Sequence, residues 1–381
     1  MANCNCKIRI GIVLYPTFGG SGVVATELGK YLADKGHEVH FITYSQPVRL
    51  AHFTKNIFYH EVAVSNYPLF DYEPYETVLA SKIVDVVQHE ELNVLHVHYA
   101  IPHASAAYMA KQILATKGIN IPFVTTLHGT DITLVGRDSS FEPVISFCIN
   151  QSDAVTAVSE SLKQDTYKHF HTEREIHVIP NFIQAPESLP QVDLEMRRRY
   201  AEDDEPVFCH ISNFRKVKRV RDVLKVFYHV NMVKASKLLL VGDGPDRHKV
   251  EELCREYKLC DRVTFVGKVR DTNDVLAISD IFVLTSETES FGLAALEALA
   301  MGVPVISTNT GGIPEVNQHG VSGYLSEVGD VKDMAKNALS ILQDEAVHRQ
   351  FRLGALEVAK KFDIASVVCR YETLYLSLIT D

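Results

Sequence analysis

The chain has 381 residues, enough for two domains at roughly 150 residues each, and its 46% hydrophobic and 23% charged residues are typical of globular proteins. Its formal net charge of −10 argues against nucleic acid as a partner, because neutralising phosphates requires a basic face. The sequence has no apolar run of the ~20 residues that a membrane helix needs, and its start lacks a signal-peptide pattern. We therefore expect a cytoplasmic protein without membrane insertion.

The first half of the chain is predicted to alternate strands and helices. Residues 8–14 form a short apolar strand, 16–22 a turn, and 24–36 a helix with apolar residues at helical spacing and a glycine at its end. With the strand that starts at Val39, this makes a βαβ unit. Further apolar strands, of the kind that parallel sheets bury on both faces, are predicted at 94–97, 123–126, 154–158 and 176–179.

The stretch 180–190 contains three prolines and no periodicity, which indicates a linker. A second series of strands follows at 207–211, 237–241, 263–266, 281–284 and 304–307. The pattern predicts two doubly wound α/β domains, 1–184 and 185–360, and a helical tail at 361–381. Because such sheets bind ligands at the carboxyl ends of their strands, two facing domains would hold a ligand in the cleft between them.

The strongest functional signal lies in segment 288–304. A predicted strand runs into a short loop, and a nearly all-apolar helix begins near Gly292. Glu297 falls within this helix, where an unpaired carboxylate is costly, so it needs donors such as ribose hydroxyls. Glu289 precedes the helix, and the backbone N–H groups near Phe291 and Gly292 can hold a diphosphate. The structural alternative makes Glu289 a helix cap and Glu297 half of a buried salt bridge.

Three weaker signals also follow predicted strands. The run Gly19-Gly-Ser-Gly permits close approach of an anion to the backbone, although a plain tight turn explains it equally well, and it is not the dinucleotide pattern G-x-G-x-x-G. Four cations within residues 215–219 favour phosphate binding over a solvated charge run because of their place at a strand end. His128 could bond a ligand with Asp131 orienting it, or be structural. Gly311-Gly-Ile-Pro-Glu adds a possible anion nest.

Together these motifs resemble the retaining glycosyltransferases of family 4, which have the GT-B fold. The resemblance rests on the E-x7-E spacing of Glu289 and Glu297, with Gly-Gly-Ser-Gly near the start and Gly-Gly-Ile-Pro-Glu after the helix. It covers essentially the whole chain. Segments 15–29, 96–104, 127–133 and 212–220 are most similar to the members that move N-acetylglucosamine from UDP-N-acetylglucosamine to the hydroxyl of L-malate, the first step of bacillithiol biosynthesis.

The resemblance implies a role for each matching residue of the donor site. Glu297 would hold the ribose hydroxyls, and Glu289 the hydroxyls of the sugar ring. Gly20 would give its N–H to the diphosphate, and Lys218 matches the family's phosphate lysine. The family's phosphate arginine, five residues before that lysine, falls on Asn213 here.

Arg215 is the candidate to supply the charge missing at that position. His128 would contact the sugar near its 6-hydroxyl, and the uracil would meet the backbone near Val269 and Arg270. Catalysis is then expected from Glu289, Lys218, Arg215 and His128, with the leaving phosphate taking the proton of the acceptor. The helical tail would pack back on the first domain.

Ser21, Tyr99, Thr126 and Arg137 are the candidates for holding malate, since a dicarboxylate needs cations or several donors. We expect no cofactor and no metal, because no cysteine and histidine pairs have zinc-finger spacing. The seven cysteines are odd in number and scattered, so Cys4 and Cys6 are interpreted as free thiols, with metal binding as the alternative.

Other functions stay open at this stage. They are a family 4 transferase with another acceptor, such as an inositol phosphate or a polysaccharide, a UDP-N-acetylglucosamine epimerase, and a non-catalytic sugar-nucleotide-binding protein. The oligomeric state is also open, with a homodimer as one option.

Overall fold

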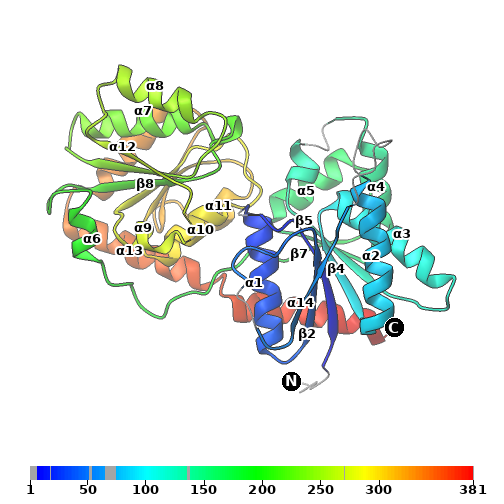
Figure 1. Cartoon of the computed structure of the whole chain (residues 1–381). Coiled ribbons are helices and arrows are strands. Elements are labelled where there is room, and N and C mark those ends of the chain that lie inside the picture. The colour runs from blue at the N-terminus through cyan, green and yellow to red at the C-terminus, as the bar shows by residue number, and fades with distance from the viewer. Residues whose placement is uncertain are drawn as a thin grey trace. The chain divides into compact units, whose positions relative to one another are not determined.

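The computed structural model describes residues 7–17, 19–50, 54–64, 74–134, 138–269 and 271–380. The chain divides into two units, one containing residues up to Asn181 together with those from Ile364 onward, the other comprising Phe182–Asp363 (Figure 1). These divisions fall within a few residues of the predicted 184/185 and 360/361. The residues Cys4, Cys6, Arg137 and Arg270, singled out in the sequence, lie outside the described ranges.

The first unit is built on a seven-stranded parallel sheet with the order β3-β2-β1-β4-β5-β6-β7. Its central strands are buried on both faces, which explains why they appear in the sequence as apolar runs rather than as alternating patterns. The strands are β1 (Arg9–Val13), β2 (Glu38–Thr43), β3 (Ile57–Glu61), β4 (Val94–His98), β5 (Phe123–Leu127), β6 (Ala154–Ala157) and β7 (Ile176–Val178).

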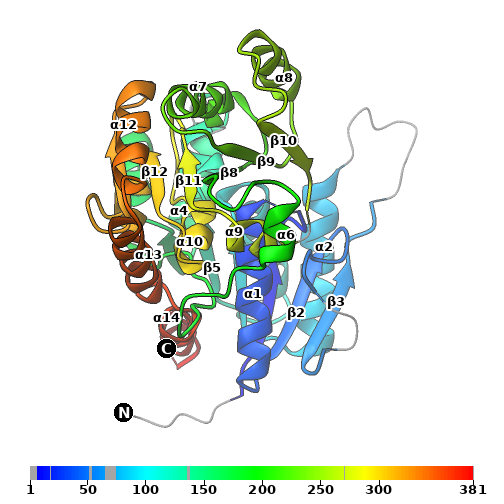
Figure 2. The same ribbon diagram turned by 90° about the vertical axis from the view of Figure 1, so that its left-hand side faces the viewer.

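Helices cover both faces of this sheet, and Figures 1 and 2 show α1 and α2 on opposite sides of it. On one side α1 packs against α14 at the end of the chain, and on the other α2 packs against α3. The helices are α1 (Gly20–Asp34), α2 (Tyr75–Glu90), α3 (Ser105–Ala115), α4 (Glu142–Gln151), α5 (Glu160–His169) and α14 (Ile364–Thr380), with π-helical turns η1 (Ala100–Ala104) and η2 (Thr130–Leu134).

The second unit contains a six-stranded parallel sheet with the order β10-β9-β8-β11-β12-β13. Its core gathers Phe208, Phe227, Leu240, Val283 and Ile306 between the sheet and the helices. The strands are β8 (Val207–Ile211), β9 (Lys237–Val241), β10 (Val263–Gly267), β11 (Ile281–Leu284), β12 (Val305–Thr308) and β13 (Gly323–Ser326). The prediction of two doubly wound α/β domains is confirmed.

The helices of the second unit come before, between and after its strands. They are α6 (Leu194–Arg198), η4 (Lys216–Lys218), α7 (Val220–Asn231), α8 (Arg247–Glu256), α9 (Asn273–Ala277), α10 (Leu293–Ala300), α11 (Ile313–Val316), α12 (Val331–Ile341) and α13 (Glu345–Lys360). Within the described ranges, every helix of the chain is too short or too polar to cross a bilayer.

In each sheet, the direction in which successive strands are added reverses once. In the first unit the chain builds outward from β1 to β3 and then returns to place β4 on the other side of β1. In the second unit the same reversal places β11 beside β8. In open α/β sheets the loops after the two strands at such a switch point diverge and leave room for a ligand. The β1/β4 and β8/β11 switch points are therefore the places to look for a site.

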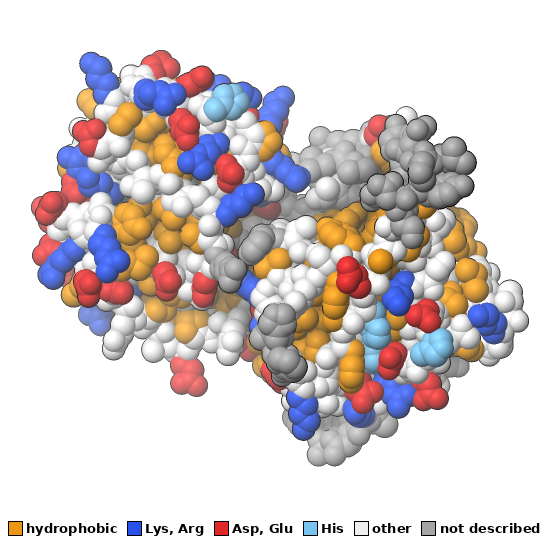
Figure 3. All heavy atoms as spheres, viewed as in Figure 1, with side chains coloured by type: hydrophobic (Ala, Val, Ile, Leu, Met, Phe, Trp, Pro, Cys, Tyr) orange, Lys and Arg blue, Asp and Glu red, His pale blue; other side chains and the backbone are white. Residues whose placement is uncertain are grey.

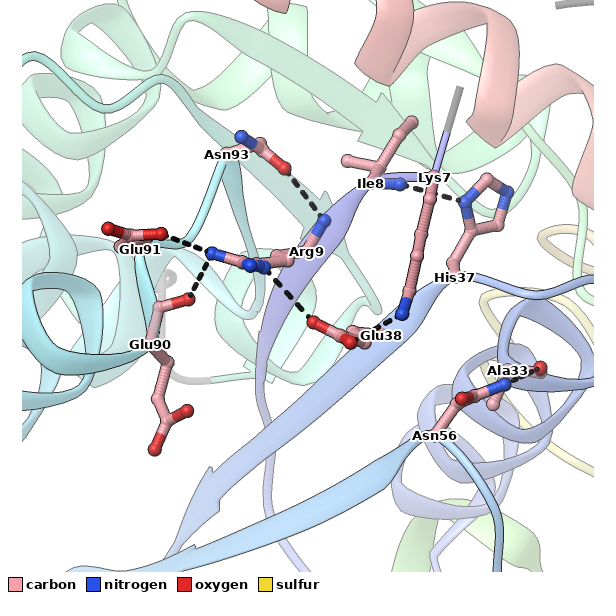
Figure 4. A network of polar contacts seen from close by, with 10 residues as sticks. All are labelled: Lys7, Ile8, Arg9, Ala33, His37, Glu38, Asn56, Glu90, Glu91 and Asn93. Atoms are coloured by element: carbon pink, nitrogen blue, oxygen red, sulfur yellow. Dashed lines mark hydrogen bonds and ion pairs between the residues drawn. The ribbon is translucent and has the colours of Figure 1, made fainter. Parts of the chain in front are cut away.

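Charged residues at the opposite, amino-terminal edge of the first sheet serve the fold instead. Arg9 bonds Glu38 at 3.0 Å and Glu91 at 2.6 Å, and Glu90 gives it only a backbone carbonyl (Figure 4). The Lys7 ammonium is the main reason why the pKa of Glu38 lies below its usual range. On the face drawn in Figure 3, Lys and Arg side chains are interspersed with Asp and Glu, so positive charge does not gather into a continuous basic surface there.

Candidate active site

Lys218 and Glu289 form an ion pair across the β8/β11 switch point. The Lys218 Nζ atom donates to Glu289 Oε2 over 2.5 Å, and the Ser286 hydroxyl donates to the same oxygen over 3.1 Å. The two charged side chains are only 21% and 16% exposed, so solvent screens this pair less than it would a surface pair. The predicted donor residues from two separate motifs therefore meet in one place.

Backbone contacts hold the two loops together. The Thr285 hydroxyl donates to the carbonyls of Lys218 and Arg219, each over 3.0 Å, and the Glu287 N–H donates to the carbonyl of Val217 over 2.8 Å. These bonds fix the position of both charges before any ligand arrives, which is the preorganisation that electrostatic catalysis requires.

Gly311 and Gly312 support the loop that carries Glu289. The Gly312 N–H donates to the Glu289 carbonyl over 2.9 Å. A Cβ atom on Gly311 would lie 2.0 Å from that carbonyl oxygen, and one on Gly312 would lie 2.4 Å from the carbonyl oxygen of Ser290. The Gly-Gly sequence is thus needed for close packing of two backbones.

Helix α10 begins at Leu293, directly after Gly292, which has a φ of +95° and, in the described structure, provides no side-chain cap. An uncapped helix start leaves backbone N–H groups that favour an anion. The Phe291 ring is buried against Phe362, so only its backbone can face a ligand. Glu297 lies one turn after Leu293 on the less buried face of α10 and is half-buried.

The cation cluster divides into two kinds of residue. Arg215 is exposed, whereas Arg219 bonds Asp222 over 2.7 Å and so has a structural partner. Asn213, which precedes the cluster, is also exposed. Arg215 also begins the 3-10 turn η4, because its carbonyl accepts the Lys218 N–H over 2.8 Å. Val269 follows β10 and is half-buried.

In the first unit, Ser21 and Tyr99 meet across the β1/β4 switch point. Their hydroxyl oxygens lie 2.6 Å apart. Tyr99 has a φ of +89°, unusual for a tyrosine, and burial raises the pKa of its phenol to about 12, so it stays protonated. Gly20 is the first residue of α1, which Gly19 precedes without a side-chain cap among the described residues. The glycine run therefore begins a helix, and its N–H groups favour an anion.

His128 lies at the carboxyl end of β5, and its Nε2 is 2.8 Å from His98 Nδ1. Burial lowers its pKa to about 3, so the ring is neutral at pH 7. Asp131 does not contact this ring with its carboxylate in the hydrogen bonds of the described structure. It accepts the N–H groups of Ala100 and Gly129 over 3.0 Å each, and burial raises its pKa. Asp131 therefore orders the loops around His128.

Thr126 is buried, with 1% of its surface exposed. Its hydroxyl lies 2.6 Å from His96 Nε2 and 2.6 Å from the Thr156 hydroxyl. The other ring nitrogen of His96 lies 2.6 Å from the Tyr375 hydroxyl of α14. The hydroxyl of Thr126 is thus bonded to other side chains within the core.

Comparison with known proteins decides the family. Residues 18–185 match the model described as Glycosyltransferase Family 4, and residues 192–357 match the model of glycosyl transferases group 1. The chain is 48% identical over 98% of its length, and 98% of the relative's, to N-acetyl-alpha-D-glucosaminyl L-malate synthase of Bacillus anthracis. The chain belongs to glycosyltransferase family 4.

More distant proteins are also similar to this chain, in sequence or in fold. This family 4 chain is 25% identical, over 96% of its length and 81% of the relative's, to the phosphatidylinositol N-acetylglucosaminyltransferase GPI3 subunit of Saccharomyces cerevisiae. Sucrose-phosphate synthase of Thermosynechococcus elongatus has the same fold with a TM-score of 0.81, at 21% identity and with 98% and 100% of the two chains covered. Anabaena HepE, in complex with UDP and glucose, gives a TM-score of 0.79 at 20% identity, with 96% and 99% covered.

Sequence reasoning missed one loop of this family 4 enzyme. Gly242, with a φ of +113°, and Gly244 follow β9, and Cβ atoms there would lie 1.8 Å from the Ser212 carbonyl oxygen and 2.0 Å from that of Asn213. The loop therefore supports the backbone that leads to Arg215 and Lys218. The signal was present as Gly242-Asp-Gly-Pro directly after a predicted strand.

His40, His60 and Glu90 bring three ligand-type atoms within 4.8 Å of one another. A metal-bound imidazole normally donates its second N–H to an acceptor. The Nε2 atom of His40 is buried without a hydrogen-bond partner in the described part of the chain, while Nδ1 lies 2.9 Å from His60 Nε2. Burial lowers the pKa of His40 to about 4, so a hydrogen bond between two neutral rings explains the contact, and we assign no metal there.

Proposed function

We propose that this glycosyltransferase moves N-acetylglucosamine from UDP-N-acetylglucosamine to the hydroxyl of L-malate, with retention at the anomeric carbon and release of UDP. The observation that carries this proposal is the 48% identity, over 98% of both chains, to the Bacillus anthracis malate synthase. The reaction would begin bacillithiol biosynthesis.

The second unit supplies the donor site in this proposal. Lys218, Arg215 and the amino end of α10 neutralise the diphosphate, and Glu297 holds the ribose hydroxyls. Glu289 binds sugar hydroxyls with its free lone pairs. Because Lys218 and Ser286 already hold one of its oxygens, Glu289 is suited to orienting the sugar rather than to exchanging protons. The backbone near Val269 would receive the uracil.

The reaction then proceeds by attack of the malate hydroxyl on the anomeric carbon, on the face that the diphosphate leaves. The bond from the anomeric carbon to the phosphate oxygen breaks, its electron pair goes to UDP, and the new bond to malate forms. The hydroxyl proton passes to the departing phosphate oxygen. Lys218 and the helix N–H groups stabilise the charge that develops on that phosphate. These groups supply the positive charge, so we propose that no metal is required.

The first unit supplies the acceptor groups. Ser21 and Tyr99 offer hydroxyls that can bond a carboxylate of malate. The N–H of Gly20, at the amino end of α1, would instead bond the diphosphate of the donor. His128 offers a neutral ring that can bond a hydroxyl without adding charge.

An acceptor screen tests the proposal. UDP release from UDP-N-acetylglucosamine should require L-malate and should not occur with inositol phosphate, with a polysaccharide or without an acceptor. The anomeric proton coupling of the product reports retention, and an excess of chelator should leave the rate unchanged. UDP release that does not depend on malate contradicts the proposed acceptor. Conversion of the donor without any acceptor would instead indicate an epimerase.

A second acceptor class has one observation in its favour, the similarity to the yeast phosphatidylinositol N-acetylglucosaminyltransferase subunit. That relative is 25% identical, far less than the malate synthase. The inositol arm of the screen distinguishes the two.

A further inference from the structure

Four buried or partly buried histidines of the first unit form a connected cluster in which His98 contacts each of the others: His96, His98, His103 and His128. His98 Nδ1 lies 2.8 Å from His128 Nε2, so one of these nitrogens carries the hydrogen that joins them. Both rings are neutral at pH 7, since burial lowers the pKa of His98 well below its usual value and that of His128 to about 3. Two arrangements are therefore open, with the hydrogen on either nitrogen.

In His103, the ring nitrogen that has no hydrogen-bond partner can be shown to carry no hydrogen. Its Nδ1 lies 2.5 Å from the His98 carbonyl oxygen, which only accepts, so Nδ1 carries the hydrogen. Burial lowers the pKa of His103 to about 4, so its Nε2 is bare. That Nε2 is buried and has no hydrogen-bond partner in the described residues. The unpartnered nitrogen is thus a lone pair and not an N–H.

His98 has the same feature. It is 1% exposed, and its Nε2 is likewise buried without a partner in the part of the chain that the structure describes. If His128 donated to His98, the single hydrogen of His98 would lie on this Nε2 as an orphaned buried N–H, a group that folded proteins rarely contain. If His98 donates, the unpartnered atom is again a lone pair.

We infer that His98 is a positioning residue that fixes His128 in one tautomer. Its Nδ1–H donates to Nε2 of His128, so the hydrogen of His128 lies on Nδ1. That Nδ1 makes no hydrogen bond to any described residue, and the side chain is partly exposed at the carboxyl end of β5. His128 therefore offers a ligand a neutral N–H donor.

This assignment limits what His128 can do. A ligand atom that meets Nδ1 must be an oxygen with a lone pair, such as a hydroxyl or carboxylate oxygen. The free nitrogen already carries its hydrogen, so His128 cannot take the proton of the acceptor hydroxyl there. The inference rests on the proposed function only for the identity of the ligand, and it agrees with transfer of the proton to the departing phosphate.

Nitrogen-15 NMR of the apo protein tests the tautomer directly. Long-range proton–nitrogen correlation spectra of histidine-labelled protein at pH 7 distinguish protonated from bare ring nitrogens, and His128→Asn assigns the signals. We expect His128 to have a protonated Nδ1 and a bare Nε2. A protonated Nε2 on His128 overturns the inference, whatever the enzyme's substrates are.

Substitution tests the role of His98. His98→Asn places an amide N–H near the Nδ1 position, whereas His98→Leu keeps the volume without a donor. We expect His98→Leu to give His128 a mixture of tautomers and to lower kcat/KM roughly tenfold, as loss of an orienting partner does elsewhere, while His98→Asn largely restores both. The exposed His89→Asn is the matched control. A pure Nδ1–H tautomer in His98→Leu, or equal losses in both variants, would show that His98 does not position His128.

Discussion

Lys218 and Glu289 are 71 residues apart in the sequence, yet their charged groups lie 2.5 Å from each other at the β8/β11 switch point of the second sheet. The contact joins the cation that we propose binds phosphate to the carboxylate that we propose binds sugar hydroxyls. The first unit repeats this arrangement with neutral groups, since Ser21 and Tyr99 join across its own switch point. Both pairs lie where a doubly wound sheet opens to a ligand.

Removal of the Lys218 charge should lower catalysis more than stability. Loss of one group that stabilises developing charge typically costs about 10²–10³ in kcat, so we expect at least a hundredfold fall for Lys218→Ala in a UDP-release assay. Lys216→Ala is the matched control, because Lys216 is an exposed cation on the same turn. Similar activities for the two variants would show that total charge, and not this ammonium, matters.

Glycine is required at position 311 for packing as well as for its backbone angle. Gly311→Ala combines a φ of +54° with a Cβ 2.0 Å from the Glu289 carbonyl oxygen, so we expect the Glu289 loop to move and UDP binding to weaken at least tenfold. Gly320→Ala is the control, since Gly320 has a φ of +78° but nothing within 4 Å of its Cβ. That variant should lose about 1–2 kcal/mol of stability and keep its affinity. Calorimetry with and without UDP measures both effects, and equal losses of affinity would contradict the packing argument.

The Ser21–Tyr99 bond should act on the acceptor and not on the donor. We expect Ser21→Ala and Tyr99→Phe each to raise the KM for malate several-fold, which corresponds to the loss of about 1 kcal/mol for one hydrogen bond. The KM for UDP-N-acetylglucosamine should stay within twofold. The double variant should cost less than the sum of the two, because both substitutions remove the same contact. Strict additivity would mean that the two hydroxyls act independently.

The buried histidines should make the first unit sensitive to acid. Burial lowers the pKa of His96 to about 3 and that of His103 to about 4, so the unfolded chain binds more protons than the folded one below pH 6.5. Stability is then retained above pH 6.5 and falls by about 1.4 kcal/mol per histidine per pH unit as the pH drops towards the folded pKa values. Asp131 acts in the opposite sense, because burial raises its pKa.

Scanning calorimetry between pH 7.5 and pH 5 measures this effect. UDP, which we expect to stabilise the second unit, identifies the transition of that unit. The transition of the first unit should fall by the larger amount. A first-unit transition that stays constant over this range would contradict the histidine assignment.

Much of the fold could be predicted because its signals are local. The buried parallel strands are apolar runs, their helices show helical spacing, and prolines interrupt the pattern near the division between the units. The strands β3 (Ile57–Glu61) and β13 (Gly323–Ser326) were not predicted, since short strands with partly buried side chains give little signal.

The sequence also marked Glu289, Lys218 and His128 as polar residues after strands, named Tyr99 as an acceptor candidate, and identified the family. It could not separate Arg219 from its neighbours, because its partner Asp222 becomes apparent only when α7 forms. Nor could it show that Thr126 is enclosed between His96 and Thr156.

The sequence by itself determined the elements, the strand-end motifs and the membership of glycosyltransferase family 4. Only the tertiary structure decided which strand ends adjoin, and hence that Lys218 meets Glu289, Ser21 meets Tyr99 and His96 meets Tyr375, which lies 279 residues further along the chain. The physical reason is that strand order in a parallel sheet depends on the crossovers and on the packing of helices on both faces. Local periodicity determines what a segment becomes, but it does not encode which neighbour that segment will have.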